Sequence, residues 1–97
     1  MVLRTYDVAG RYGGEEFLLI LPQTSTDDAS DLMERLRLFV SDLVFENAKG
    51  KRITISAGMM AYEYGVSMDV EALFRCADDA LYLAKEKGKD RIEWGGV

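Results

Sequence analysis

Hydrophobic and polar positions in the first half of the chain follow two periods, one typical of strands and one typical of a helix. Two apolar runs joined by paired glycines predict a β-hairpin with strands at residues 6–12 and 16–22. Hydroxyl and acidic side chains at residues 24–28 supply the N-cap and the first turn of a helix. The helix has a single apolar stripe, formed by Ala29, Leu32, Met33, Leu36, Val40 and Leu43.

The second half of the chain predicts a strand, a helix and a further strand. Alternation predicts a strand at residues 52–61, with Gly58 marking a bulge or a close backbone approach. A helix is expected at residues 69–87, ending at Gly88. Its apolar stripe consists of Val70, Leu73, Phe74, Ala77, Leu81 and Ala84. With a last strand at residues 91–94, the order β-β-α-β-α-β predicts an α+β fold with both helices packed on one sheet.

The composition narrows the class of protein. The chain of 97 residues makes one domain at most, and a hydrophobic content of 48% argues against disorder. A net charge of −5 argues against a nucleic-acid polymer or an anionic membrane as partner. The sequence has no apolar run of membrane-spanning length, no signal-peptide pattern and only one cysteine, Cys76, so we expect a cytoplasmic location. The absence of histidine excludes histidine-based acid–base catalysis.

The most informative chemistry lies at the predicted hairpin turn, where residues 11–17 read RYGGEEF. Gly13 and Gly14 suit a tight turn with φ > 0 and let the backbone approach a phosphate closely. Glu15 and Glu16 open the second strand, so the pleat directs them to opposite faces. A carboxylate beside exposed backbone N–H groups is compatible with a Mg²⁺–nucleotide site. The alternative is a solvated turn with two ordinary surface glutamates.

Three further segments accompany GGEEF: RTYD at residues 4–7, ISAGMM at residues 55–60 and ADDALYLAKEKGKDRI at residues 77–92. In this order they resemble the RxxD motif, the central strand and the last helix and strand of the GGDEF family of diguanylate cyclase domains. The resemblance covers nearly the whole chain. It implies a ferredoxin-like sheet of polymerase-palm type. It also implies a nucleotidyltransferase that joins two GTP into cyclic di-GMP, with two domains facing each other in a homodimer.

The resemblance assigns roles to the residues of the turn. Glu15 would bind the catalytic Mg²⁺, and Glu16 would be a supporting carboxylate. Gly13 and Gly14 would leave room for the nucleotide. Phe17 is expected to anchor the strand in the core.

The same resemblance assigns phosphate binding to Lys85 and Lys89, which match the basic residues of the family motif AKxxGRNR. Lys89 replaces an arginine, and the loss of its bidentate fork predicts a weaker phosphate contact. Asp90 replaces the usual asparagine and adds a negative charge beside the pair. For Lys85, the alternative is a solvated lysine favoured by the helix dipole.

An inhibitory site for cyclic di-GMP is implied at Arg4, Asp7 and Arg35. Arginine forks can bind phosphate oxygens and stack on guanine, and Asp7 can accept hydrogen bonds from a guanine edge. The alternative for Arg35 is a surface ion pair with Asp31, four residues earlier.

The family segment DxDxFKxxND, which carries a central strand and a metal-binding aspartate, has no counterpart in residues 1–97. The chain therefore resembles the C-terminal part of the domain. Because Glu15 alone cannot hold two Mg²⁺ ions, we expect a cyclase ancestry but an inactive chain. A non-catalytic cyclic di-GMP receptor module and a remnant used only for protein contacts are the alternatives. Two inner strand edges should pair with each other or with a second copy.

Overall fold

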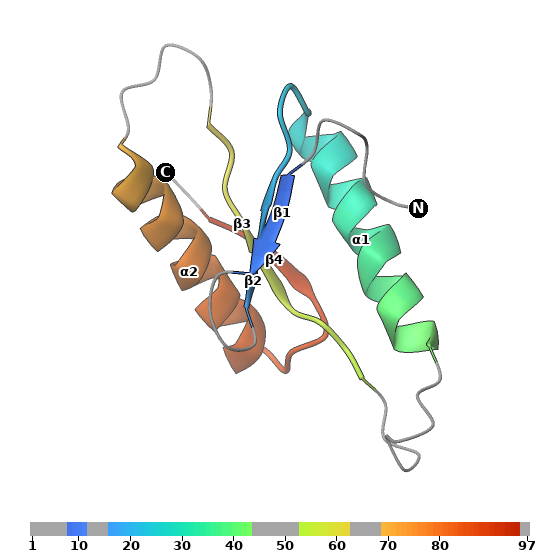
Figure 1. The fold of residues 1–97 in the computed structure, drawn as a ribbon. Coiled ribbons are helices and arrows are strands. Elements are labelled where there is room, and N and C mark those ends of the chain that lie inside the picture. Colours follow the sequence, from blue (N-terminus) through green and yellow to red (C-terminus); the bar gives the residue numbers. More distant parts are fainter. Residues whose placement is uncertain (1–7, 12–15, 44–52, 63–68, 96–97) are drawn as a thin grey trace.

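The computed structural model describes residues 8–11, 16–43, 53–62 and 69–95. Helices and strands follow one another in the predicted order (Figure 1), and the strands predicted at residues 16–22, 52–61 and 91–94 are shorter than predicted. The elements are β1 (Val8–Arg11), β2 (Phe17–Ile20), α1 (Thr26–Asp42), β3 (Ala57–Met59), α2 (Val70–Glu86) and β4 (Ile92–Trp94).

The strands form two separate two-stranded sheets within the described part of the chain. Strands β1 and β2 pair antiparallel, with Val8 opposite Ile20 and Arg11 opposite Phe17. Strands β3 and β4 pair in parallel, and α2 provides the crossover that parallel neighbours require. The prediction of one sheet carrying both helices is therefore wrong for the described residues, although the α+β class is confirmed.

Helix α1 begins where the sequence predicts. The Ser25 hydroxyl accepts a hydrogen bond from the Asp28 backbone N–H at 3.0 Å, and Asp27 and Asp28 lie at the positive end of the helix dipole. The first half of the predicted stripe is buried, at Ala29, Leu32 and Met33. Leu36 and Val40 are half-buried and Leu43, the last member of the stripe, is exposed, so burial decreases along α1 towards its C-terminal end.

Both ends of α2 are closed by hydrogen bonds. At the N-terminus, the Asp69 carboxylate accepts from the Ala72 N–H at 2.7 Å. At the C-terminus, Gly88 has a φ of +119°, a conformation that favours glycine. The Gly88 N–H donates to the Lys85 carbonyl at 3.3 Å, and the Lys89 N–H donates to the Ala84 carbonyl at 2.9 Å. These two bonds form a Schellman motif and confirm the predicted helix end.

The core lies where α2 crosses β3, and small residues allow a close contact there. A Cβ on Gly58 would lie 2.1 Å from the Ala77 carbonyl oxygen and 2.3 Å from the Leu81 nitrogen. Ala80 and Ala84 on the same helix are buried. The predicted stripe missed Ala80, and it included Val70, which is exposed. Only small residues fit where a strand and a helix approach each other this closely. An apolar stripe read from the sequence gives more weight to large apolar residues.

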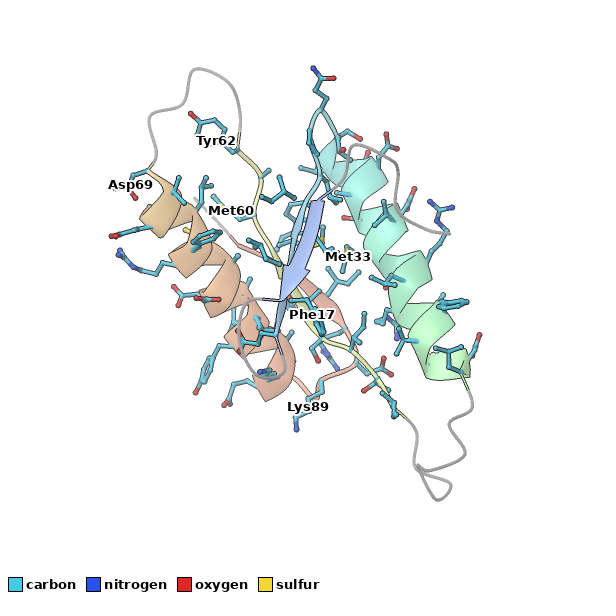
Figure 2. All side chains as sticks on the ribbon, viewed as in Figure 1. Phe17, Met33, Met60, Tyr62, Asp69 and Lys89 are labelled. Carbon is cyan, nitrogen blue, oxygen red and sulfur yellow. The ribbon has the colours of Figure 1, made fainter. Side chains whose placement is uncertain are left out.

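The β1–β2 hairpin is much less covered than expected. Phe17 is 73% exposed and Ile20 50% exposed, so the prediction of Phe17 as a core anchor is wrong. Figure 2 shows the Phe17 side chain between the two helices as viewed. Side chains project from the faces of a sheet, and among the described elements β2 packs closely only against β1, so no helix covers the face on which Phe17 lies.

Three further features concern Cys76, Trp94 and the length of the helices. Cys76 is half-buried on α2, as a small filler residue would be. The Trp94 indole N–H donates to the Ser30 hydroxyl at 2.8 Å and so ties β4 to α1. Neither described helix is long and apolar enough to cross a membrane.

The contact at Gly58 generates a stability prediction. Gly58→Ala should lower the free energy of unfolding by about 2 kcal/mol or more, because the new methyl group meets backbone atoms that cannot rotate away. Gly10→Ala is the matched control, since a Cβ there has no atom within 4 Å. That control should stay within about 1 kcal/mol of the wild type. Urea unfolding checks both variants, and equal stabilities would contradict the contact.

Candidate functional site

The glycine–glutamate motif stands in the sequence between the two strands of the hairpin. The last paired residues are Arg11 and Phe17, so residues 12–16 connect the strands. Glu16 is half-buried immediately before β2. The predicted site residues Gly13, Gly14 and Glu15, like Arg4 and Asp7, lie outside the described residues, and their roles stay predictions.

The two candidate phosphate-binding lysines lie at the C-terminal end of α2. Lys85 is in the last turn and Lys89 follows Gly88, and both side chains are exposed. The Schellman hydrogen bonds fold the chain back so that both lysines belong to one end of the helix. Figure 2 shows Lys89 beyond this end, directed away from the other labelled side chains. Because the C-terminal end of a helix dipole is negative, binding of an anion here depends on the lysine charges.

The backbone around Lys89 is unusual. Lys89 has a φ of 64° and Asp90 a φ of 51°, both in the left-handed region that few residues other than glycine adopt. Asparagine and aspartate tolerate this region, whereas lysine has no such preference. The Asp90 N–H donates to the Ser56 hydroxyl at 3.1 Å, which connects the loop to the segment before β3.

A three-residue ion-pair network connects α1 to this loop. The Arg37 Nη1 donates to the Asp90 carboxylate at 2.7 Å and approaches the Asp90 carbonyl oxygen at 3.5 Å. The Arg37 Nε donates to the Glu34 carboxylate at 3.0 Å, and Nη2 bonds the other carboxylate oxygen. Arg37 is therefore held on both sides, with only 16% of its side chain exposed.

The network also sets the charge states of its members. Hydrogen bonds from Arg37 hold the pKa of the Glu34 carboxyl below its ordinary value, with a smaller direct contribution from the Arg37 charge. The bonds to Glu34 and then to Asp90 raise the pKa of Arg37, so the guanidinium stays charged at every relevant pH. Arg37 thus remains a permanent cation beside Asp90.

Sequence reasoning missed Arg37. It selected Arg35 in the same segment, by resemblance. The spacing of Glu34 and Arg37 is a recognisable helical pair, but Asp90 lies 53 residues further along the chain than Arg37. Nothing in a single sequence connects two positions so far apart.

Arg35 itself is exposed on α1. The alternative ion pair with Asp31 is not formed, and among the residues with described positions Arg35 has no ion-pair partner. Its guanidinium is therefore accessible to a ligand.

The charges near the lysines are partly compensated. Lys87 pairs with Glu93 at 3.1 Å, and Arg37 pairs with Asp90. Within the described ranges Lys85 and Lys89 form no ion pair. Asp90 and Glu93 are thus each paired with another cation, whereas Glu86, next to Lys85, has no ion pair in the described part.

The side chains that bear on metal binding in this chain are carboxylates. Adjacent glutamates provide the hard oxygen ligands that suit Mg²⁺. The residues whose positions are described contain no group of three or more acidic, histidine or cysteine side chains able to hold a metal ion. Of the predicted carboxylate pair, Glu16 is among the described residues and Glu15 is not, so the role of Glu15 as a metal ligand stays a prediction.

Comparison with known proteins places this site in context. A family model described as "Diguanylate cyclase, GGDEF domain" matches residues 1–91. The chain is 45% identical over 93 residues to the diguanylate cyclase DgcP of Pseudomonas aeruginosa, covering 94% of this chain and 13% of that protein. It is 35% identical over 91 residues to the diguanylate cyclase DosC of Escherichia coli K12, covering 94% of this chain and 20% of that protein.

Solved structures give the same result for the fold. The active GGEEF domain of a diguanylate cyclase from Vibrio cholerae superposes with a TM-score of 0.86 at 30% identity, over 99% of this chain and 60% of that one. The GGDEF domain of DgcB from Caulobacter crescentus, in complex with c-di-GMP, superposes with a TM-score of 0.84 at 30% identity. That match covers 96% of this chain and 56% of that one. The chain thus spans little more than half of these domain structures and at most a fifth of these curated relatives.

The Arg37 network generates a pH prediction. The pKa of Glu34 is lowered in the folded state, so its contribution to stability is present above its ordinary pKa of 4.5 and is lost as the pH falls through the lower folded pKa. Glu34→Gln should therefore lose less stability than the wild type between about pH 6 and about pH 3. The difference should not exceed about 1 kcal/mol, because solvent screens this partly exposed pair.

Urea unfolding across this pH range provides the measurement. Asp31→Asn, a neutralised carboxylate on the same helix without an ion pair in the described part, serves as the control and should follow the wild type. Identical acid dependence of wild type and Glu34→Gln would contradict the network.

Proposed function

This chain belongs to the GGDEF family, and from that premise we propose that it supplies the GGEEF hairpin and the phosphate-binding helix end of a diguanylate cyclase. The observation that carries the proposal is the combination of two features in one fold of this family. The glycine–glutamate motif stands in the sequence between β1 and β2, and two lysines free of ion pairs in the described part lie at the end of α2. The reaction proposed is 2 GTP → cyclic di-GMP + 2 pyrophosphate.

The proposed chemistry is an in-line displacement. The 3′-hydroxyl oxygen of one GTP attacks the α-phosphorus of the other, the new phosphodiester bond forms, and the bond to pyrophosphate breaks. Glu15 would hold Mg²⁺, which when bound neutralises charge on the phosphates, and Glu16 would support it. Lys85 and Lys89 would bind phosphate oxygens, while Gly13 and Gly14 would allow the nucleotide to approach the backbone.

Cyclic di-GMP contains two identical phosphodiester bonds, each formed from one 3′-hydroxyl group and one α-phosphate. This symmetry supports a proposed homodimer. Each domain would bind one GTP, and two domains facing each other would present each 3′-hydroxyl to the opposite α-phosphate. GTP and cyclic di-GMP are the proposed small-molecule partners, and the cytoplasm, where GTP is available, is the proposed location. The proposal includes neither a membrane nor a nucleic-acid polymer as partner of this segment.

The proposal assigns no cyclase activity to residues 1–97 by themselves. The sequence contains no counterpart of DxDxFKxxND, the family segment that carries a metal-binding aspartate. Incubation with GTP and Mg²⁺ should yield no more cyclic di-GMP than a Glu15→Ala control, as measured by chromatography. Product above this control would show that the chain completes the site in another way.

A second candidate function is a receptor for cyclic di-GMP. Two observations favour it: the DgcB domain to which the chain is similar is a complex with c-di-GMP, and Arg35 is exposed without a described ion-pair partner. Arg4 and Asp7 would complete the site, which in an active cyclase would mediate product inhibition. This use needs no metal and no second substrate.

The receptor proposal predicts that the chain binds cyclic di-GMP more tightly than GTP. Arg4→Ala should weaken cyclic di-GMP binding by about 1.5–3 kcal/mol, the scale of a hydrogen bond to a charged group. Arg75→Ala removes an exposed arginine on α2, outside the proposed site, and should leave the affinity unchanged. Calorimetry measures both variants, and equal affinities of Arg4→Ala and wild type would exclude the site.

A further inference from the structure

We propose that Arg37 is a positioning residue for the phosphate contact at Lys85 and Lys89, and that it acts through Asp90. The inference rests on the proposed function, because it requires an anionic ligand at these lysines. No part of the family resemblance assigns a role to Arg37. The argument depends on the conformation of two residues, on the rigidity of one side chain and on the local charge.

The conformation of Lys89 and Asp90 has to be imposed by contacts, because both residues have positive φ. Hydrogen bonds from three parts of the fold supply those contacts. The Lys89 N–H is bound by α2 through the Ala84 carbonyl, and the Asp90 N–H by the Ser56 hydroxyl. The Asp90 carboxylate is bound by Arg37 of α1 at 2.7 Å. Arg37 is the only one of these contacts that is charged, and it anchors the residue next to Lys89.

The guanidinium of Arg37 is well suited to fix a neighbour in place. Its planar fork has donors in fixed directions, and two of them are occupied by Glu34. The third direction, through Nη1, points to Asp90. Because Glu34 and Arg37 belong to the same helix, the orientation of the fork is set within α1 and transmitted to the loop.

Arg37 also changes the charge that a ligand meets. Asp90 follows Lys89 directly, so an uncompensated carboxylate there would repel a phosphate bound to that lysine. Arg37 compensates this carboxylate, and Lys87 compensates Glu93 in the same way. The positive charges of Lys85 and Lys89 are then opposed by no free carboxylate of these two residues. Figure 2 shows Lys89 directed away from the body of the molecule, where a ligand can reach it.

A purely structural role makes different predictions. If Arg37 only attached α1 to the loop, its loss would lower stability and affect binding only through unfolding. If Arg37 positions Lys89 and compensates Asp90, the loss of affinity caused by removing Arg37 should depend on the presence of Asp90 and of Lys89. It also predicts that removing the Asp90 charge restores part of the binding.

Inorganic tripolyphosphate, titrated into the 97-residue chain and followed by NMR, is the probe. Arg37→Gln should weaken binding by about fivefold, the effect of one partly screened charge. Asp90→Asn in the Arg37→Gln background should restore only part of the affinity, because it removes the uncompensated carboxylate but does not rebuild the anchor beside Lys89. Arg75→Gln, which removes an exposed arginine on α2 outside the described ion pairs, should change it by less than about twofold. In a Lys89→Ala background, Arg37→Gln should have little further effect, because the two residues act on one contact.

The outcomes separate the inference from the function on which it rests. If Lys85→Ala and Lys89→Ala weaken binding but Arg37→Gln does not, only the inference is wrong. If Arg37→Gln weakens binding equally with and without Lys89, the role is structural and the inference is again wrong. If the wild type does not bind, or binds as its lysine variants do, the proposed phosphate site itself fails. Should Arg37→Gln not fold, Arg37→Lys and Asp90→Asn replace it. The first should bind less tightly than the wild type, the second at least as tightly, and the opposite order overturns the inference.

Discussion

The contact between β3 and α2 at Gly58 determines how the rest of this structure is arranged. With no side chain at Gly58, the strand approaches the backbone of the helix to a distance that no Cβ would permit. The direction and depth of α2 then set where its last turn falls. Gly88 reverses the chain at that point, and β4 returns parallel to β3 to complete the sheet. The candidate phosphate contact at the C-terminal end of α2 is therefore placed by a contact in the core.

The ion pair of Arg37 and Asp90 supplies the connection that the sheets do not. Strands β3 and β4 form a separate sheet from the hairpin, so backbone pairing does not join the two halves of the described structure. Side chains of α1 do so instead, through Trp94 and Ser30 at one position and through Arg37 and Asp90 at another. Both are polar contacts over a small core. The orientation of α1 thus depends on these two hydrogen bonds as well as on the apolar side chains that the helix buries.

Local patterns in the sequence predicted the fold well. They did not predict contacts between residues that are far apart in the sequence. Ser25 as N-cap, Gly88 as helix end and Gly58 as a close approach each follow from the conformational needs of one position, and each is confirmed. The exposure of Phe17 could not be predicted, because it depends on what covers the hairpin in space. For the site, residue types and motif order indicated the lysines. The role of Arg37 required a contact across 53 positions, which periodicity does not record.

The two departures from the family motif at this loop have opposite physical effects. Lysine in place of arginine at residue 89 replaces a planar fork by a point charge, so the contact with a ligand loses directionality. Aspartate in place of asparagine at residue 90 gives Arg37 a charged acceptor, and charge-assisted hydrogen bonds are stronger than those to an amide. The loop is therefore held more firmly while its ligand contact becomes less directional. A flexible lysine side chain can still reach a phosphate. The firmly held backbone limits the region in which its ammonium group can lie. In this chain the precision of the site is thus located in the Arg37–Asp90 pair and no longer in the residue that would contact the ligand.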